Sequence, residues 1–192
     1  MARINIPNTG LWSAIAAILN NLFTQLFQFK YVGIYDYNDA GTSITPVSVT
    51  AAAGWVDLPN DGNGQFTTKY PLDTVSEVWD PLTNTFDFSS LDIGDSVEIR
   101  FDASAVTSNP NQEVKVRLLL AVGTPAEYAL KWVSAYPKNA GTYDALRWNG
   151  FYIGNPETRN NPAKFQIESD GNMDVTVNGW YIKVTKQAME LV

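Results

Sequence analysis

The 192-residue chain contains no histidine and no cysteine. Without imidazole or thiol groups there is no Ser-His-Asp or Cys-His nucleophile, no zinc site of the usual ligands, no disulfide and no thiolate redox centre. Basic residues are also scarce, with 13 Lys and Arg against 20 Asp and Glu. Because binding to phosphates needs clustered Lys and Arg, we expect no nucleic-acid partner.

The formal charge of -7 is unevenly spread along the chain. Residues 1–35 carry a net +2, residues 36–102 carry -10 and residues 103–192 carry +1. A hydrophobic fraction of 45% is enough to build a sizeable core without disulfides. We therefore expect two parts: an N-terminal arm and helix at 1–30, and a folded, acidic domain at 31–192.

The N-terminal part predicts an amphipathic helix. No charged residue lies between Arg3 and Lys30. Apolar side chains recur there at alternating steps of three and four, which is a heptad pattern. The apolar face is wider than the seam between two helices, so we expect a trimeric coil or an anchor, with packing onto the chain's own domain as the alternative. The pattern consists of Trp12, Ile15, Leu19, Leu22, Leu26 and Phe29.

Two other interpretations of this segment involve a membrane. A secretory signal begins with a positively charged region, and the start of this chain, which includes Asn5 and Pro7, is a poor match to one. A spanning helix needs about 20 mostly apolar residues, and Asn20 and Gln25 interrupt the second half. We therefore expect no membrane partner, although a membrane-associated protein anchored by residues 11–29 remains an alternative.

After Lys30, hydrophobic and polar residues alternate with a period of two, which is typical of strands with one buried face. Turn-forming residues such as those at 61–64 separate the runs, and Pro46 places its own run at a sheet edge. Twelve short strands with no helix between them predict an antiparallel sandwich or barrel. The expected strands are 31–37, 44–50, 54–58, 65–70, 85–88, 97–101, 114–120, 128–132, 148–153, 163–167, 173–177 and 179–185.

Paired carboxylates are the remaining route to catalysis. The pairs are Asp36 with Asp39, Asp92 with Asp95, and Asp170 with Asp174. A glycosidase uses two such carboxylates at a fixed separation. Most of these side chains, however, lie beside Gly or Asn in turns, where they cap backbone N–H groups. Residues 168–174 hold three carboxylates around a glycine without the spacing of a twelve-residue calcium loop, so a hairpin turn is preferred there to a calcium site. We expect no catalytic residue, no cofactor and no metal.

Aromatic residues suggest a contact surface. Trp180 lies in an alternating run and is expected in the core. Trp79 lies next to a proline-containing loop, and Tyr136 and Tyr143 lie within a predicted loop at 134–145. We expect these three side chains to be exposed and to belong to a contact surface.

Four segments resemble the jelly-roll domains of tailed-bacteriophage virion proteins. They are GWVDLPNDGNG at 54–64, VWDP at 78–81, FDFSSLDIGDSVEIRFD at 86–102 and, similar to the last strand of the family, VNGWY at 177–181. The resemblance covers roughly residues 31–187. Its motifs mark turns and core strands, so they transfer no functional residues.

The resemblance implies an all-β fold, an antiparallel jelly-roll β-sandwich with a short N-terminal α-helix. In that family, and in the tumour-necrosis-factor-like jelly rolls that it resembles, three protomers form a compact head and a helix or arm attaches it to the particle. We therefore expect a non-enzymatic homotrimer that decorates or cements a phage capsid, or forms a head fibre. Its partners would be itself and the major capsid protein or another virion protein, and it would assemble in the bacterial cytoplasm. A tail fibre or receptor-binding protein that recognises a host surface glycan or protein is the alternative.

Overall fold

The computed structural model describes residues 10, 13–20 and 31–187. The chain divides into two units, Met1–Lys30 and Tyr31–Val192. In the first unit residues 13–20 are helical, with Ile15 partly buried and Leu19 exposed. The remaining members of the predicted heptad pattern lie outside the described residues, so the self-association of this helix stays a prediction. These members are Trp12, Leu22, Leu26 and Phe29.

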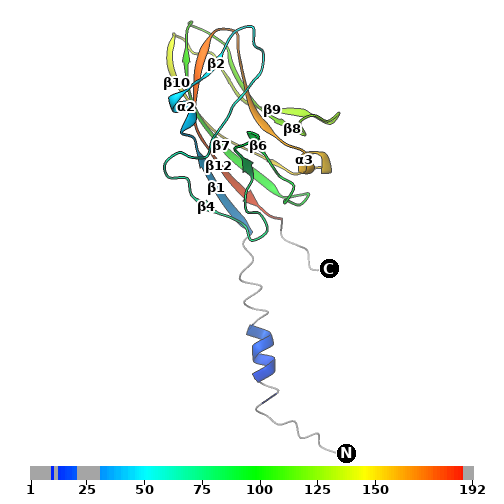
Figure 1. Cartoon of the computed structure of the whole chain (residues 1–192). Coiled ribbons are helices and arrows are strands. Elements are labelled where there is room, and N and C mark those ends of the chain that lie inside the picture. Colours follow the sequence, from blue (N-terminus) through cyan, green and yellow to red (C-terminus); the bar gives the residue numbers. More distant parts are fainter. Residues whose placement is uncertain (1–9, 11–12, 21–30, 188–192) are drawn as a thin grey trace, which may run out of the picture. The chain divides into compact units, whose positions relative to one another are not determined.

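The second unit is built from strands, with two short helices between them (Figure 1). Burial alternates along the long strand β7: Val97, Ile99 and Phe101 are buried, while Glu98 and Arg100 reach the surface. The elements are β1 (Val32–Asn38), α2 (Gly41–Ile44), β2 (Val47–Val49), β3 (Val56–Asp57), β4 (Lys69–Tyr70), β5 (Trp79–Asp80), β6 (Thr85–Phe86), β7 (Ser96–Thr107), β8 (Val114–Leu120), β9 (Tyr128–Ala135), β10 (Gly141–Tyr152), α3 (Pro156–Asn160), β11 (Lys164–Ser169) and β12 (Met173–Thr185).

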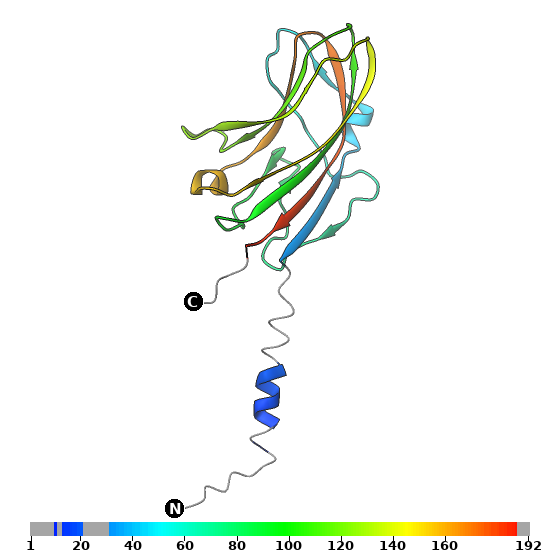
Figure 2. The same ribbon diagram turned by 180° about the vertical axis from the view of Figure 1, so that it is seen from behind.

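Apart from the two-stranded sheet of β5 and β6, the strands form two antiparallel sheets that face each other (Figures 1 and 2). The first sheet has the order β10-β7-β12-β1-β4, with β2 also paired to β12, and the second has the order β3-β11-β8-β9. Numbering the eight principal strands along the chain (β1, β3, β7, β8, β9, β10, β11, β12) gives the orders 6-3-8-1 and 2-7-4-5. This is the double Greek key of a jelly roll, and it confirms the predicted all-β antiparallel sandwich.

An aromatic cluster fills the space between the sheets. Phe101 and Trp180 come from the first sheet and Phe165 from the second, with ring centroids 5.1 Å apart for Phe101 and Phe165 and 5.0 Å apart for Phe165 and Trp180. Trp79 and Phe86, from the β5–β6 hairpin, pack against them at 4.6 Å from one another. These separations are typical of favourable aromatic pairs. The cluster therefore fixes the two sheets in one alignment.

Two short helices contradict predictions about the elements. Helix α3 contradicts the expectation that no helix lies between the strands: the Asn155 side chain accepts a hydrogen bond from the Thr158 N–H, and Pro156 begins the helix. Helix α2 likewise replaces the start of the predicted strand at 44–50, because Ile44 is its last residue.

Strand β12 joins two predicted strands, 173–177 and 179–185. The register with β7 shifts between Val177 and Gly179, as in a β-bulge. A Cβ atom on Gly179 would lie 2.7 Å from the Tyr37 carbonyl oxygen, so a residue without a side chain is required where β1 passes.

Candidate functional site

Four side chains form a row across the outer face of the first sheet. Trp148 of β10 lies opposite Arg100 of β7, Arg100 lies opposite Tyr181 of β12, and Tyr181 lies opposite Asp36 of β1. Cross-strand partners in register point to the same side of a sheet. We refer to Trp148, Arg100, Tyr181 and Asp36 as the aromatic row.

Direct contacts hold the row together. The Trp148 and Tyr181 ring centroids are 5.3 Å apart, and the Arg100 guanidinium carbon lies 5.4 Å from the Tyr181 centroid, within cation–π range. The Trp148 Nε1–H donates to Glu98 Oε2 at 2.8 Å, and Lys183 Nζ donates to the other oxygen at 2.9 Å. These two hydrogen bonds lower the pKa of Glu98. The Trp148 indole is therefore oriented by an ionised carboxylate.

Apolar side chains extend the row along β10. Leu146, Trp148 and Tyr152 are 55%, 47% and 68% exposed. Because they alternate along one strand, they lie on the same face. Val106 of β7 is exposed on this face too, opposite Thr142. Aligned exposed apolar and aromatic residues are typical of interaction sites.

The monomer does not satisfy all the polar atoms of the row. Within the described part of the chain, Arg100 Nε and Asp36 Oδ1 are buried without a hydrogen-bond partner. Burial raises the pKa of Asp36, and the nearby Arg100 charge opposes that shift only in part. Buried polar atoms without partners cost free energy. A partner that supplies a hydrogen bond to either atom would recover that cost.

The charges on this face are mixed, in contrast to the acidic chain as a whole. Arg100 and Lys183 lie among Asp36, Glu98 and Asp102 in neighbouring strands. The face therefore has little of the acidic excess of the whole chain and offers charges of both signs to a partner surface.

The predicted contact residues do not form one surface. Trp79 is only 2% exposed, so its predicted exposure is wrong: it pairs with Phe86 in the β5–β6 hairpin, and its Nε1–H donates to the Asn60 carbonyl. Tyr136 is exposed and its hydroxyl donates to Glu113. Tyr143 lies in β10 rather than in a loop, is half-buried, and donates to a carbonyl of the 136–140 loop. A contact role for the two tyrosines stays a prediction.

One member of each carboxylate pair considered for catalysis accepts a hydrogen bond from a backbone N–H. Asp39 Oδ2 accepts from the Thr42 N–H at 2.7 Å. Asp95 Oδ2 accepts from the Asp92 N–H at 2.9 Å, and Asp170 and Glu113 are linked in the same way. In the described residues, no group of three or more acidic side chains is placed to hold a metal ion. Asp39, Asp95 and Asp170 are thus engaged in holding the local backbone.

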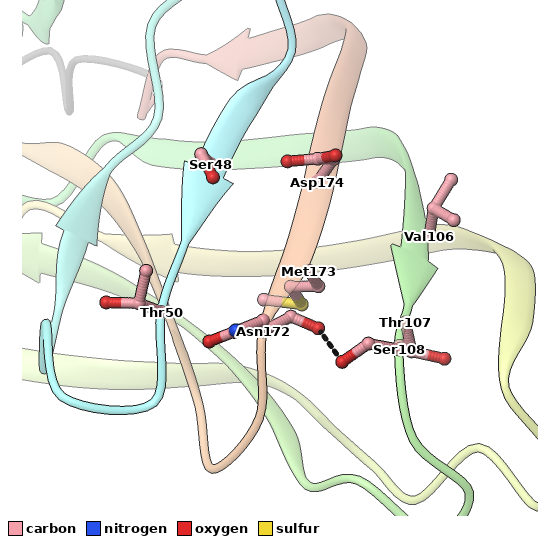
Figure 3. Close-up of a pocket in the computed structure, with 8 residues that line it drawn as sticks. All are labelled: Ser48, Thr50, Val106, Thr107, Ser108, Asn172, Met173 and Asp174. Carbon is pink, nitrogen blue, oxygen red and sulfur yellow. Dashed lines mark hydrogen bonds between the residues drawn. The ribbon is translucent and has the colours of Figure 1, made fainter.

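A cavity of about 330 Å³ lies where β2, β7 and β12 meet (Figure 3). The Ser108 hydroxyl donates to the Asn172 carbonyl at 2.7 Å across it. Asp174 is the only titratable side chain in its lining, so the cavity holds no pair for general acid–base catalysis. The lining consists of Ser48, Thr50, Val106, Thr107, Ser108, Asn172, Met173 and Asp174.

The row was missed in the sequence because it joins four strands far apart in the chain. Trp148, Arg100 and Tyr181 each fall in a predicted strand, but only the pairing register brings them together.

No helix among the described residues has the length and apolarity needed to cross a membrane.

No protein-family model matches this chain, and no curated protein matches it. Solved structures do resemble it. One, of the Gx strain of infectious bursal disease virus, has a TM-score of 0.41 at 10% identity, covering 83% of this chain and 33% of the viral chain. Another, of the Gt strain, has a TM-score of 0.36 at 14% identity, covering 74% and 33%.

A further solved structure that resembles this chain is that of Eiger TNF from S. frugiperda. It has a TM-score of 0.35 at 7% identity, covering 83% of this chain and 96% of that one. The present chain thus spans about a third of the length of the two viral chains. The jelly-roll fold rests on the strand order described above rather than on these likenesses.

Proposed function

We propose that this protein is a non-enzymatic structural protein of a virus particle that assembles as a homotrimer through the outer face of its first sheet. The observation that carries the proposal is the exposed aromatic row with its flanking apolar residues on β10. The segments that resemble phage virion proteins support the viral assignment.

The face is large enough for a stable interface. Strands β7, β10 and β12 are 12 or 13 residues long, and β1 adds a fourth strand. At about 4.8 Å per strand and about 3.3 Å per residue, the face covers about 700 Å². A standard interface buries about 800 Å² per partner. Contact over this face would therefore suffice.

Three-fold symmetry follows from the resemblance and suits the charges. In a closed ring each protomer uses two different surfaces, so the exposed face of one copy meets a neighbouring side of the next. The mixed charges of the face avoid the repulsion that two strongly acidic surfaces would suffer.

Attachment to the particle is assigned to the N-terminal unit. Its described helical residues include exposed Ile18 and Leu19, which present apolar surface. The expected partner is the major capsid protein or another virion protein. Deleting residues 1–30 should abolish binding to capsids that lack this protein; full binding by the shortened chain would contradict this assignment.

Light scattering tests the trimer directly. The full chain and a version that begins at Tyr31 should both show three times the mass of their single chains, which is 21.2 kDa for the full chain. If both are monomers, the trimer is wrong. If only the full chain is trimeric, the helix holds the assembly and the sheet face does not.

A further inference from the structure

Two cations lie directly opposite one another on the outer face of the second sheet. Arg117 of β8 is the cross-strand partner of Lys131 of β9. Like charges in such positions repel each other and destabilise the strand pair. Of the carboxylates in the described residues, none forms an ion pair with either cation. In a chain with a net charge of -7, two adjacent cations without an acidic partner indicate an anion-binding site.

Arg117 is held in one orientation by neutral neighbours. Its Nε and Nη2 donate to Gln166 Oε1 at 2.9 and 2.7 Å. The Gln166 amide nitrogen in turn donates to Asp57 Oδ1 at 2.6 Å, which directs the amide oxygen toward Arg117. The guanidinium carbon also lies 4.1 Å from the Trp55 ring centroid. The cation is thus fixed in position while three of its five N–H donors have no partner among the described residues.

A cavity of about 310 Å³ lies beside these cations, at the lower end of the size range of small-molecule sites. Its lining combines three kinds of group: the cations, hydrogen-bonding groups and apolar side chains. Glu113 is one of the hydrogen-bonding groups, and its carboxylate is oriented by hydrogen bonds from Tyr136 and Lys115. The lining consists of Trp55, Glu113, Lys115, Val116, Arg117, Ala129, Lys131, Val133 and Ser134.

This combination selects among anions. The Arg117 and Lys131 donors favour a carboxylate. The Glu113 carboxylate disfavours a compact polyanion such as phosphate, yet it accepts hydrogen bonds from hydroxyl groups, as Ser134 also does. Ala129 and Val133 offer apolar contact to the CH groups of a ring. A singly charged ligand with many hydroxyl groups fits all three requirements.

We propose that this cavity binds an acidic sugar unit, with the sugar carboxylate at Arg117 and Lys131 and its hydroxyl groups at Glu113 and Ser134. The site lies within one protomer and on the sheet opposite to the aromatic row, so it does not depend on the trimer.

Calorimetric titration of the full chain with glucuronate, and with glucose as the neutral counterpart, tests the proposal. We expect saturable binding of glucuronate and none of glucose at about 50 mM. Lys131→Gln should weaken glucuronate binding about ten-fold or more, because it removes a charge-assisted hydrogen bond. Lys138→Gln, which removes the same charge from the exposed 136–140 loop, should bind as the wild type does.

Ala129→Leu is a second test that leaves every charge in place. It extends into the cavity from an exposed strand position, so it should weaken glucuronate binding without loss of thermal stability. Acetate and phosphate are the competing anions. The sugar assignment is overturned if either binds as tightly as glucuronate, and the site itself is overturned if glucuronate does not bind or if Lys131→Gln and Lys138→Gln behave alike.

Discussion

Replacement of Trp148 by alanine is the sharpest test of the proposed interface. The indole is about half exposed in the monomer. Aromatic side chains bury 150–250 Å², so about 100 Å² of Trp148 remains to be covered by a partner. At about 25 cal/mol per Å², that area contributes about 2.5 kcal/mol to each contact.

The effect is amplified in a closed trimer. A loss of about 2.5 kcal/mol corresponds to a roughly 70-fold weaker contact. Three equivalent contacts would raise the overall dissociation constant of the trimer about 300,000-fold, if the contacts are additive. Sedimentation equilibrium over a series of protein concentrations should therefore show Trp148→Ala as monomer where the wild type is trimer.

A matched control separates the interface from general surface hydrophobicity. Leu82 is 92% exposed in the turn between β5 and β6, outside the proposed face. Leu82→Ala should leave the mass distribution unchanged. Because Trp148→Ala also loses the hydrogen bond to Glu98, its thermal unfolding must be compared with that of the wild type. A folded Trp148→Ala that associates as the wild type does would refute the assignment of this face.

Three further predictions concern stability. Tyr37→Phe removes the hydroxyl that accepts from the buried Val78 N–H, so the free energy of unfolding in urea should fall by about 1–3 kcal/mol; Tyr70→Phe, at an exposed position, should change little. Trp180 carries a buried Nε1–H without a partner in the described residues, so Trp180→Phe should lower the free energy of unfolding by less than about 1.5 kcal/mol. Trp180→Ala, which leaves a cavity, should lower it by about 3–5 kcal/mol, and equal losses for the two variants would contradict this reasoning. Burial raises the pKa of Asp36 above 3.8, so the folded protein holds this proton more tightly than the unfolded chain and stability falls as the pH rises through the raised value. Asp36→Asn should therefore raise the melting temperature at about pH 7 and leave it nearly unchanged at about pH 3.

The alternating pattern predicted the sandwich because burial in a strand depends on local order. In β7 every second residue from Val97 onward faces the core, and the sequence shows the same alternation. The sequence also contains a start signal for helix α3, because Asn155 followed by Pro156 is typical of a helix N-terminus. The helix has a single turn, however, which is too short to show a helical period.

The burial of Trp79 and the existence of the aromatic row could not be predicted from the alternating pattern. Trp79 lies in a two-residue strand, which is too short to show alternation, and tertiary packing against Phe86 and Trp180 buries it. The row depends on registers that join four strands. Such registers are set by the packing of the whole sandwich and not by any one segment.

The two proposed sites would act together in the assembly. Sheets in a sandwich pack about 10 Å apart with their outer faces on opposite sides. A trimer whose two contact surfaces are the face of the first sheet and an edge of the sandwich would therefore leave the cavity beside Arg117 and Lys131 open to solvent in each protomer. The three sites of one trimer would bind a polymeric acidic glycan more tightly than a single sugar, because binding at one site raises the effective concentration of the polymer at the other two. Trp148→Ala should therefore keep the wild-type affinity for glucuronate but lose most of the affinity for a polyuronate, measured on an immobilised polymer. Loss of both affinities would show that the cavity depends on the trimer, and retention of both would show that the sites do not cooperate.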